Sequence, residues 1–567
     1  MGRADAPLLL DVRREAKFRE SPYLIAGAQW CAPEDVAAFA TAQPPREVVV
    51  YCVYGHNVSA DAVTELRAAG WNAFMLAGGI EGGEDGVDAP QDIAQWRAQR
   101  PLTIVKPSDR GVAGKSGERP AAVSFSDALK FWLKLGFISF GGPAGQIAIM
   151  HRELVEQKRW ISERRFLHAL NYCMLLPGPE AQQLATYIGW LMHRTWGGVV
   201  AGALFVLPSL FILIALSWVY VAFGEVPLVA GMFYGIKPAV AAIVLQAVHR
   251  IGSRSLRKPA QAPVLWAVAA ISFIAIYVLN MPFPLIVLGA AVVGWLGARF
   301  SPAQFSGGAG HGQAKQGYGA ALIDDDTPTP AHARFKPSRL AAVLGVGAVL
   351  WLLPMGALMA TQGWDATLTQ MGWFFTKAAL LTFGGAYAVL PYVYQGAVEQ
   401  FHWLTGPQMI DGLALGETTP GPLIMVVAFV GFMGGWAKQV LGPDMLFVGA
   451  ALAASVVTWF TFLPSFLFIL AGGPLVESTH GKLHFTAPLT AITAAVVGVI
   501  ASLALFFLAH IALRADTGGS WLARVDFYAL AITLGAAVAL LRYKRGVIQV
   551  IAASALAGLL LRLSGLA

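Results

Sequence analysis

Long apolar stretches alternate with short polar ones from about residue 125 to the last residues of the chain. Many of these stretches approach the roughly 20 residues that a helix needs to cross a bilayer. The pattern therefore predicts a polytopic α-helical membrane protein with about thirteen membrane segments. We expect these segments at 131–150, 166–194, 197–222, 227–248, 263–280, 283–300, 339–360, 373–395, 408–435, 445–471, 486–512, 525–542 and 546–563.

The first hundred residues follow a different pattern. Short apolar runs have the length of buried strands, and one stretch between them has helical spacing. The runs lie at 8–10, 48–51 and 73–76, and the helical stretch at 59–69. This alternation predicts a small α/β domain over 1–105, followed by a flexible polar linker over 106–124.

Composition supports the membrane interpretation. Of the 567 residues, 13% are charged and 56% are hydrophobic, whereas soluble domains carry roughly 25% charged residues. These figures exclude a soluble globular protein and a disordered one. The three cysteines exclude a disulfide framework and a cysteine-rich metal site. We expect no metal and no cofactor.

Charge is unevenly distributed. Residues 1–110 carry 11 Lys/Arg and 15 Asp/Glu, a net of −4, and the remainder carries 29 and 18, a net of +11. Excess basic residues in a membrane chain are typical of cytoplasmic loops, although they would also favour an anionic substrate. No basic run with interleaved aromatic residues indicates nucleic-acid binding. No signal peptide pattern opens the chain, so we expect a cytoplasmic head on a bacterial-type inner membrane protein.

One cysteine in the head stands where reactive cysteines occur. Cys52 ends a predicted strand, and a predicted helix begins just behind it at Ser59. Loop N–H groups and the helix N-terminus would stabilise a thiolate or an oxyanion there. A half-buried structural cysteine is an equally good interpretation of the residue alone.

The head resembles the rhodanese (sulfurtransferase) family over about 80 residues. The resemblance rests on 11–13, 27–28, the Cys52 loop and 76–79, in the family's order and spacing. It implies a cysteine that carries a persulfide. The family's arginine five positions after that cysteine is Asn57 here, and the first strand and helix look short. A degenerate sensor or docking head is therefore an alternative to an active enzyme.

The membrane part contains an internal repeat. Over 131–179, 13 of 49 residues recur 243 positions later without a gap, and Leu207-Pro208-Ser209 returns as Leu463-Pro464-Ser465. An odd number of segments between the copies would turn the second copy upside down. Such inverted repeats are typical of secondary transporters, whose substrate site lies near the midplane.

Loop charges test this orientation. With the head inside, the loops 249–258, 301–337 and 542–545, which all carry Lys and Arg, are cytoplasmic, as expected. The basic loop 151–165 disagrees, because counting every segment as a crossing places it outside. A re-entrant 131–194 would remove the disagreement, and the sequence does not decide between the two.

The recurring helix breakers carry the candidate chemistry. Pro177-Gly178-Pro179 and Pro420-Gly421-Pro422 interrupt apolar spans and free backbone polar groups, which a membrane tolerates only inside protein or beside a cavity. The half-helices behind them, starting near Glu180 and Leu423, would point positive N-termini at an anion. A simple kink in each span is the alternative.

Further candidates lie around these breaks. Gly141-Gly142 and Gly384-Gly385 would expose N–H groups to a ligand or allow close helix packing. Lys134 and Lys377 would line the path or snorkel to the surface. The carboxylates Glu180 and Glu417 would couple protons or pair with the lysines. Neutral hydrogen bonds to an oxyanion would come from Gln146, Gln182, Gln183, Thr418 and Thr419.

Residues 125–567 resemble the chromate ion transporter family. The resemblance rests on 140–143, 160–163, 177–180, 382–387 and 417–422, in both halves. It implies an inner-membrane carrier that exports chromate, is driven by the proton-motive force and confers chromate resistance. It divides the membrane part into a first repeat (125–300), a cytoplasmic loop (301–338), a connecting helix (339–360) and a second repeat (361–567).

Three functions compete on the sequence. A chromate efflux carrier is favoured, and a carrier of sulfate or another oxyanion is close to it, since sulfate has the same charge and shape. A membrane-tethered sulfurtransferase needs far fewer spans than this chain has. The expected partners are the small oxyanion and the lipid bilayer, and a homodimer is left open.

Overall fold

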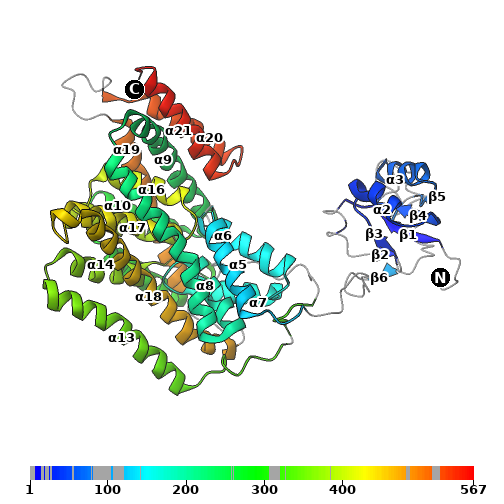
Figure 1. Cartoon of the computed structure of the whole chain (residues 1–567), viewed down its shortest axis with the longest axis horizontal. Coiled ribbons are helices and arrows are strands. Elements are labelled where there is room, and N and C mark those ends of the chain that lie inside the picture. Colours follow the sequence, from blue (N-terminus) through cyan, green and yellow to red (C-terminus); the bar gives the residue numbers. More distant parts are fainter. Residues whose placement is uncertain are drawn as a thin grey trace. The chain divides into compact units, whose positions relative to one another are not determined.

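The computed structural model forms two compact units, Met1–Arg119 and Pro120–Ala567 (Figure 1). Each unit is described by itself. The residues that the structure describes are 7–14, 18, 24–25, 28–53, 57–77, 79–80, 104–105, 120–140, 142–256, 258–259, 261–305, 320–325, 327–383, 385–479, 486–513 and 524–566. Most of the predicted linker, Gly141, Gly384, and 54–56 of the Cys52 loop lie outside them.

The head is a small α/β domain, as predicted. Its main sheet has four parallel strands in the order β3-β1-β4-β5, with apolar side chains of β1 and β4 in the core. A second sheet pairs β2 with β6 antiparallel. The elements are β1 Leu8–Asp11, β2 Leu24–Ile25, β3 Gln29–Trp30, α2 Val36–Ala42, β4 Glu47–Tyr51, α3 Asn57–Ala68, β5 Asn72–Met75 and β6 Ile104–Val105.

The second unit is helical throughout its described part. Its helices are α5 Phe125–Ile138, α6 Gly142–His151, α7 Glu163–Leu175, α8 Glu180–Phe223, α9 Pro227–Ser255, α10 Pro263–Tyr277, α11 Phe283–Phe300, α12 Pro302–Phe305, α13 Pro337–Gln362, α14 Thr367–Leu381, α15 Ala386–Tyr394, α16 Gly406–Thr418, α17 Val426–Ala437, α18 Leu446–Thr479, α19 Thr486–Ala512, α20 Phe527–Leu541 and α21 Val547–Leu563. Among the described residues, six helices are long and apolar enough to cross a membrane, and four shorter apolar helices accompany them.

The repeat found in the sequence has the same local structure twice. In each copy a helix ends at a glycine break, a second helix runs into a π-helical turn, and a third ends at Pro-Gly-Pro. The π turns, η3 Arg152–Gln157 and η4 Gln395–Gln400, lie 243 residues apart. Arg159 and His402, also 243 apart, both have a positive φ, of 51° and 50°. The two copies therefore share an unusual backbone path as well as residues.

The predicted single span 131–150 is two helices. α5 has 14 residues and α6 has 10, which at 1.5 Å per residue gives about 21 Å and about 15 Å. Neither reaches the roughly 30 Å of a bilayer core. The break at Ser139–Gly142 frees the chain to reverse, because Gly142 has a φ of 67°.

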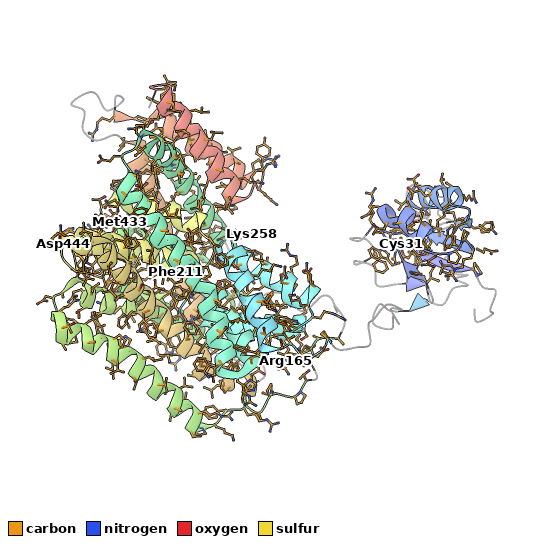
Figure 2. The ribbon with its side chains drawn as sticks, in the orientation of Figure 1. Cys31, Arg165, Phe211, Lys258, Met433 and Asp444 are labelled. Atoms are coloured by element: carbon orange, nitrogen blue, oxygen red, sulfur yellow. The ribbon has the colours of Figure 1, made fainter. Side chains whose placement is uncertain are left out.

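The segment before α13 is bound to the first copy. Ile161 and Ile323 form a parallel bridge, in which the N–H of Ile323 donates to the carbonyl of Trp160 at 3.0 Å. Arg165, labelled in Figure 2, donates to the carbonyl of Asp324 at 3.2 Å and pairs with Glu477 at 3.0 Å. The loop 158–162 and the segment 321–325 therefore lie side by side.

The first part of α8 ends beside the start of α5 and the segment before α13. The helix is broken at His193 and Arg194, and Arg194 has a φ of 59° and a ψ of −158°. Just before this break, the imidazole of His193 is 2.9 Å from the carbonyl oxygen of Val123, and that of His332 is 2.9 Å from the carbonyl oxygen of Trp190. The start of α5, the end of the first part of α8 and the segment before α13 thus gather at one end of the unit.

Candidate functional site

The two repeat copies meet at their helix breaks. The N–H of Gly178 donates to the carbonyl of Thr382 at 2.7 Å, and the N–H of Gly421 donates to the carbonyl of Ser139 at 2.8 Å. Adding 243 to 178 and 139 gives 421 and 382, so the two bonds are the same contact made in both directions. Reciprocal contacts of this kind are the mark of a two-fold relation between two copies.

Glycine is required at the centre of each Pro-Gly-Pro break. Gly178 and Gly421 have φ values of 127° and 106°, which side chains of L-residues rarely allow. A Cβ on Gly178 would lie 2.4 Å from Ser465 Oγ, and one on Gly421 would lie 2.8 Å from the Cβ of Ser209. These serines belong to the repeated Leu-Pro-Ser, so this close approach is reciprocal too.

The half-helices behind the breaks present uncapped N-termini. α8 begins at Glu180 and the short η5 helix, Leu423–Met425, begins as predicted at Leu423. Their N-cap residues, Pro179 and Pro422, have no polar side chain to accept from the first N–H groups. Such N–H groups, together with the helix dipole, favour an anion.

Buried amides surround the crossing. Gln146 donates to the carbonyl oxygens of Gly421 and Ser139, so it joins both copies. Gln183 donates to the carbonyl of Pro177 at 2.8 Å and Gln182 to the hydroxyl of Thr186 at 3.0 Å. All three amides are almost fully buried. The three amides predicted from the sequence therefore lie together at the crossing, and their role in binding stays a prediction.

Three buried polar atoms at the crossing have no hydrogen-bond partner. They are Oε1 of Gln182, Oε1 of Gln183 and Oγ of Ser465. The Gln183 amide and the Ser465 hydroxyl both lie within 3 Å of the position a Gly178 Cβ would take. Unsatisfied buried polar groups are rare in proteins. The hydroxyl of Ser465 can donate to a bound group, whereas the two amide oxygens can only accept.

The two predicted carboxylates both reach the glycine break of the second copy or the residues just after it. Glu180 Oε1 is 3.9 Å from the position of a Cβ on Gly385, so it reaches the glycine break of the second copy. Glu417 is buried and accepts a hydrogen bond from the Tyr387 hydroxyl. Thr418 and Thr419 donate to the carbonyl of Leu415 at 2.9 Å and 2.6 Å, so their hydroxyl protons are used within α16.

The two predicted lysines contact other side chains. Lys134 is 60% exposed, and its Nζ is 3.7 Å from Glu153 Oε1. Lys377 is half-buried and lies over the ring of Trp373 at 5.7 Å. Glu153 belongs to the π turn η3, and Trp373 lies one helical turn before Lys377.

Sequence reasoning missed four polar residues. Ser465 and Ser209 lie against the central glycines of the two Pro-Gly-Pro breaks. The repeated Leu-Pro-Ser in the sequence could have identified them. Asp411 and Lys237 form an ion pair at 3.2 Å, and their signal was an isolated charge inside an apolar span.

The head places Cys52 at the carboxyl end of β4. It is buried, and the hydroxyl of Ser59 lies 2.9 Å from its sulfur. A second buried thiol, Cys31, labelled in Figure 2, lies elsewhere in the core. Burial, together with the carboxylates of Asp35 and Glu34, raises the pKa of Cys31 to about 11. Asp11 and Arg13 form a fully buried ion pair at 2.6 Å.

Comparison with known families places both units. The family model described as "Chromate transporter" matches residues 126–295 and 369–559, which together are well over half of the chain. The chain belongs to the chromate transporter family. Its first residues also match the model of the "Rhodanese-like domain", over 1–85. Both resemblances expected from the sequence are thereby confirmed.

Named relatives agree with the family assignment. The chromate transport protein of Cupriavidus metallidurans is 31% identical over 396 residues, 70% of this chain and 85% of that protein. The chromate transport protein of Pseudomonas aeruginosa is 33% identical over 384 residues, 67% and 80% of the two chains. An uncharacterized transporter of Methanocaldococcus jannaschii is 23% identical over 376 residues, 66% and 82%. No solved structure matches the chain.

These findings make the protein a multi-pass membrane transporter of the chromate transporter family that carries a rhodanese-like domain. A transporter of this kind is not expected to be an enzyme in its membrane unit. The rhodanese-like domain leaves sulfurtransferase activity open.

Proposed function

We propose that the protein exports chromate, a tetrahedral dianion, through the crossing of its two broken helices. The observation that carries the proposal is the pair of uncapped helix N-termini beside the reciprocal Gly178–Thr382 and Gly421–Ser139 bonds. The uncapped N–H groups and the unpartnered hydroxyl of Ser465 at this point can donate hydrogen bonds to an oxyanion. Two relatives named as chromate transport proteins support chromate as the substrate.

The proposal includes an inverted arrangement of re-entrant hairpins. In it, α5 and α6 enter the membrane and return to one face, as do α7 and the first part of α8. The contacts of 123, 161, 193, 323 and 332 at one end of the unit support this path. Five crossings, by the second part of α8, α9, α10, α11 and α13, then separate the copies. An odd number of crossings starts the second copy from the opposite face.

Charge supports the side on which the first copy opens. With re-entrant hairpins, the basic loop 151–165 moves to the same face as 249–258, 301–337 and 542–545. The one loop that opposed the positive-inside rule then obeys it. That face is cytoplasmic in our proposal, and the head, joined to residue 120, lies on it.

Membrane potential favours export over uptake. Moving one charge through 100 mV is worth about 2.3 kcal/mol, so a dianion leaving a cell that is negative inside gains about 4.6 kcal/mol per 100 mV. This corresponds to a gradient of roughly a thousandfold. Glu180 and Glu417 remain our candidates for added proton coupling, and Lys134 and Lys377 for attracting the anion from nearby.

Everted membrane vesicles test the proposed function. Respiring vesicles that contain the protein should accumulate radiolabelled chromate, and collapse of the membrane potential should stop the accumulation. Gln183→Leu should lose most of the flux, since it removes an amide beside Gly178, whereas Gln549→Leu, at the start of α21, should keep it. Accumulation that survives collapse of both the potential and the pH gradient would contradict this mechanism and point to exchange against another anion.

Two other functions have a specific basis. Sulfate shares the charge and shape of chromate, so competition by sulfate in the same vesicles measures that alternative. Sulfur transfer by the head is favoured by the contact of Cys52 with Ser59 at 2.9 Å. A thiosulfate:cyanide sulfurtransferase assay on the full chain and on Cys52→Ser tests it.

A further inference from the structure

A cavity with several polar and charged lining residues lies between the helices at the other end of the unit. Its volume is about 560 Å³, and its walls come from α8, α9, α16, α17 and α21. Its lining includes Met433 of α17, which Figure 2 labels. None of the residues at the break crossing lines it. In the proposed topology it opens on the outer face of the membrane, where the anion would leave.

The charged groups of this cavity form one tight pair and two separate charges. Lys237 of α9 contacts Asp411 of α16 at 3.2 Å, and the hydroxyl of Tyr220 donates to the same carboxylate oxygen at 2.8 Å. Among the described lining residues, Glu225 and Arg562 are the other charged ones. Lys237 is 32% exposed, whereas Asp411 is 3% exposed.

The arrangement leaves the carboxylate under-satisfied. Lys237 and Tyr220 both contact Oδ2 of Asp411, and its Oδ1 is buried without a hydrogen-bond partner. A buried ionised carboxylate normally fills its lone pairs with several donors. The pair with Lys237 is therefore the main compensation for the Asp411 charge, and Lys237 is the member of the pair that water in the cavity reaches.

We propose that Lys237 is an oxyanion-binding residue in this outer cavity and that Asp411 is a built-in anion competing with the substrate for it. This inference deepens the proposed function, because the ligand class is the same tetrahedral dianion. An incoming oxyanion replaces the carboxylate beside Lys237, with the guanidinium of Arg562 as a second cation on the cavity wall. Protonation of Asp411 releases Lys237 and favours the oxyanion.

The sign of the pH effect follows from this competition. A proton on Asp411 and an anion on Lys237 favour each other, so oxyanion affinity rises as the pH falls. The groups that face the pair are Tyr220 from α8, Tyr234 from α9 and Arg562 from α21, with Glu225 at the turn between α8 and α9. Tyr234 is engaged with Asp526 at 2.7 Å. Asp411 is thus the carboxylate in direct contact with Lys237.

Binding to the purified full chain in detergent tests the inference without any need for flux. The probes are radiolabelled sulfate, which stays a dianion throughout the titration, and radiolabelled chromate. Wild-type affinity for sulfate should rise about tenfold or more as the pH falls from about 8 to about 5. Asp411→Asn should bind tightly at both pH values. Lys438→Gln, which changes an exposed lysine just beyond α17, is the matched control and should behave as wild type.

Lys237→Gln alone leaves Asp411 as an unpaired buried charge and could fail to fold for that reason. The double variant Lys237→Gln with Asp411→Asn removes both charges and keeps the shape. It should fold and lose the pH-dependent binding. The single variant Lys237→Arg, which keeps a cation beside Asp411, should retain binding. Unchanged binding of both probes in the double variant would overturn the inference. Displacement of sulfate by an anionic phospholipid, with no effect of free chromate, would assign the cavity to a lipid headgroup and also overturn it.

The two proposals fail separately. Wild-type protein that binds oxyanion through Lys237 but shows no chromate flux in vesicles would contradict the proposed function alone. Protein that transports chromate while the double variant binds and transports as wild type would contradict only the inference about Lys237.

Discussion

Gly178 and Thr382 are joined by a backbone hydrogen bond of 2.7 Å, although 204 residues separate them in the sequence. The counterpart of each in the other repeat copy makes the same bond, Gly421 to Ser139 at 2.8 Å. The two helix breaks of one copy are thus each completed by a break of the other. A transport site at this crossing has two equivalent halves, and a change in either half should act alike.

Gly178→Ala and Gly421→Ala should each abolish most chromate flux. An added Cβ would meet Ser465 Oγ at 2.4 Å or Ser209 Cβ at 2.8 Å, and it would occupy a backbone conformation that costs about 1–2 kcal/mol for an L-residue. Vesicle flux, normalised to protein in the membrane, measures the effect. Gly289→Ala in α11, where nothing lies within 4 Å, is the control and should transport normally. A large loss in one of the two glycine variants and none in the other would contradict the equivalence of the copies.

Lys134→Gln should weaken transport only modestly. Lys134 is 60% exposed and its contact with Glu153 is 3.7 Å long, and such pairs contribute about 0–1 kcal/mol. We therefore expect a flux reduced by about fivefold at most, with normal insertion into the membrane. A complete loss of flux with normal expression would place Lys134 directly on the substrate path. Lys377→Gln, the equivalent change, is measured beside it.

The sequence predicts where the helices break, but it does not predict that the breaks of the two copies contact each other. Glycine and proline at 177–179 and 420–422 have local consequences, and the helices do begin again at Glu180 and Leu423. That Gly178 finds Thr382 rather than a residue of its own copy depends on packing between segments far apart in the chain. The pairing of 161 with 323 is hidden for the same reason, since neither segment has a pattern that names its partner.

Two isolated charges inside predicted apolar spans also indicate a functional site. Lys237 lies inside the predicted span 227–248 and Asp411 inside 408–435, where an ionisable residue is a functional candidate by default. Attention to the repeat favoured residues that recur 243 positions apart, and neither of these does. Lys237 and Asp411 have no counterpart in the other repeat copy, so only the structure shows that they form a pair, with Nζ 3.2 Å from Oδ2.

The Cys31 thiol of the head should resist alkylation at pH 8. Its pKa is raised from 9.0 to about 11, first by burial and then by Asp35 and Glu34, so its thiolate fraction at pH 8 is about one in a thousand. Because the pKa is raised, this thiol favours the folded state below about pH 9, and that contribution is lost as the pH rises through about 11. Mass spectrometry of the iodoacetamide-treated full chain measures the rate. Labelling in the native protein as fast as in urea would contradict the assigned environment.

The contact between Ser162 and Asp325 provides a test of the re-entrant hairpin. The Ser162 hydroxyl donates to Asp325 at 2.6 Å, which requires 151–165 and the segment before α13 to share one face of the membrane. In a variant whose three native cysteines are replaced, Ser162→Cys with Asp325→Cys should form a disulfide under mild oxidation. Ser162→Cys with Asp365→Cys, which pairs Ser162 with the turn after α13, should not. Each single cysteine at 162 or 325 should also react with a membrane-impermeant thiol reagent in everted vesicles and not in intact cells, since both lie on the cytoplasmic face in the proposed topology. Labelling of 162 from outside intact cells would mean that 131–150 crosses the bilayer, and would remove the basis for placing the two breaks at its midplane.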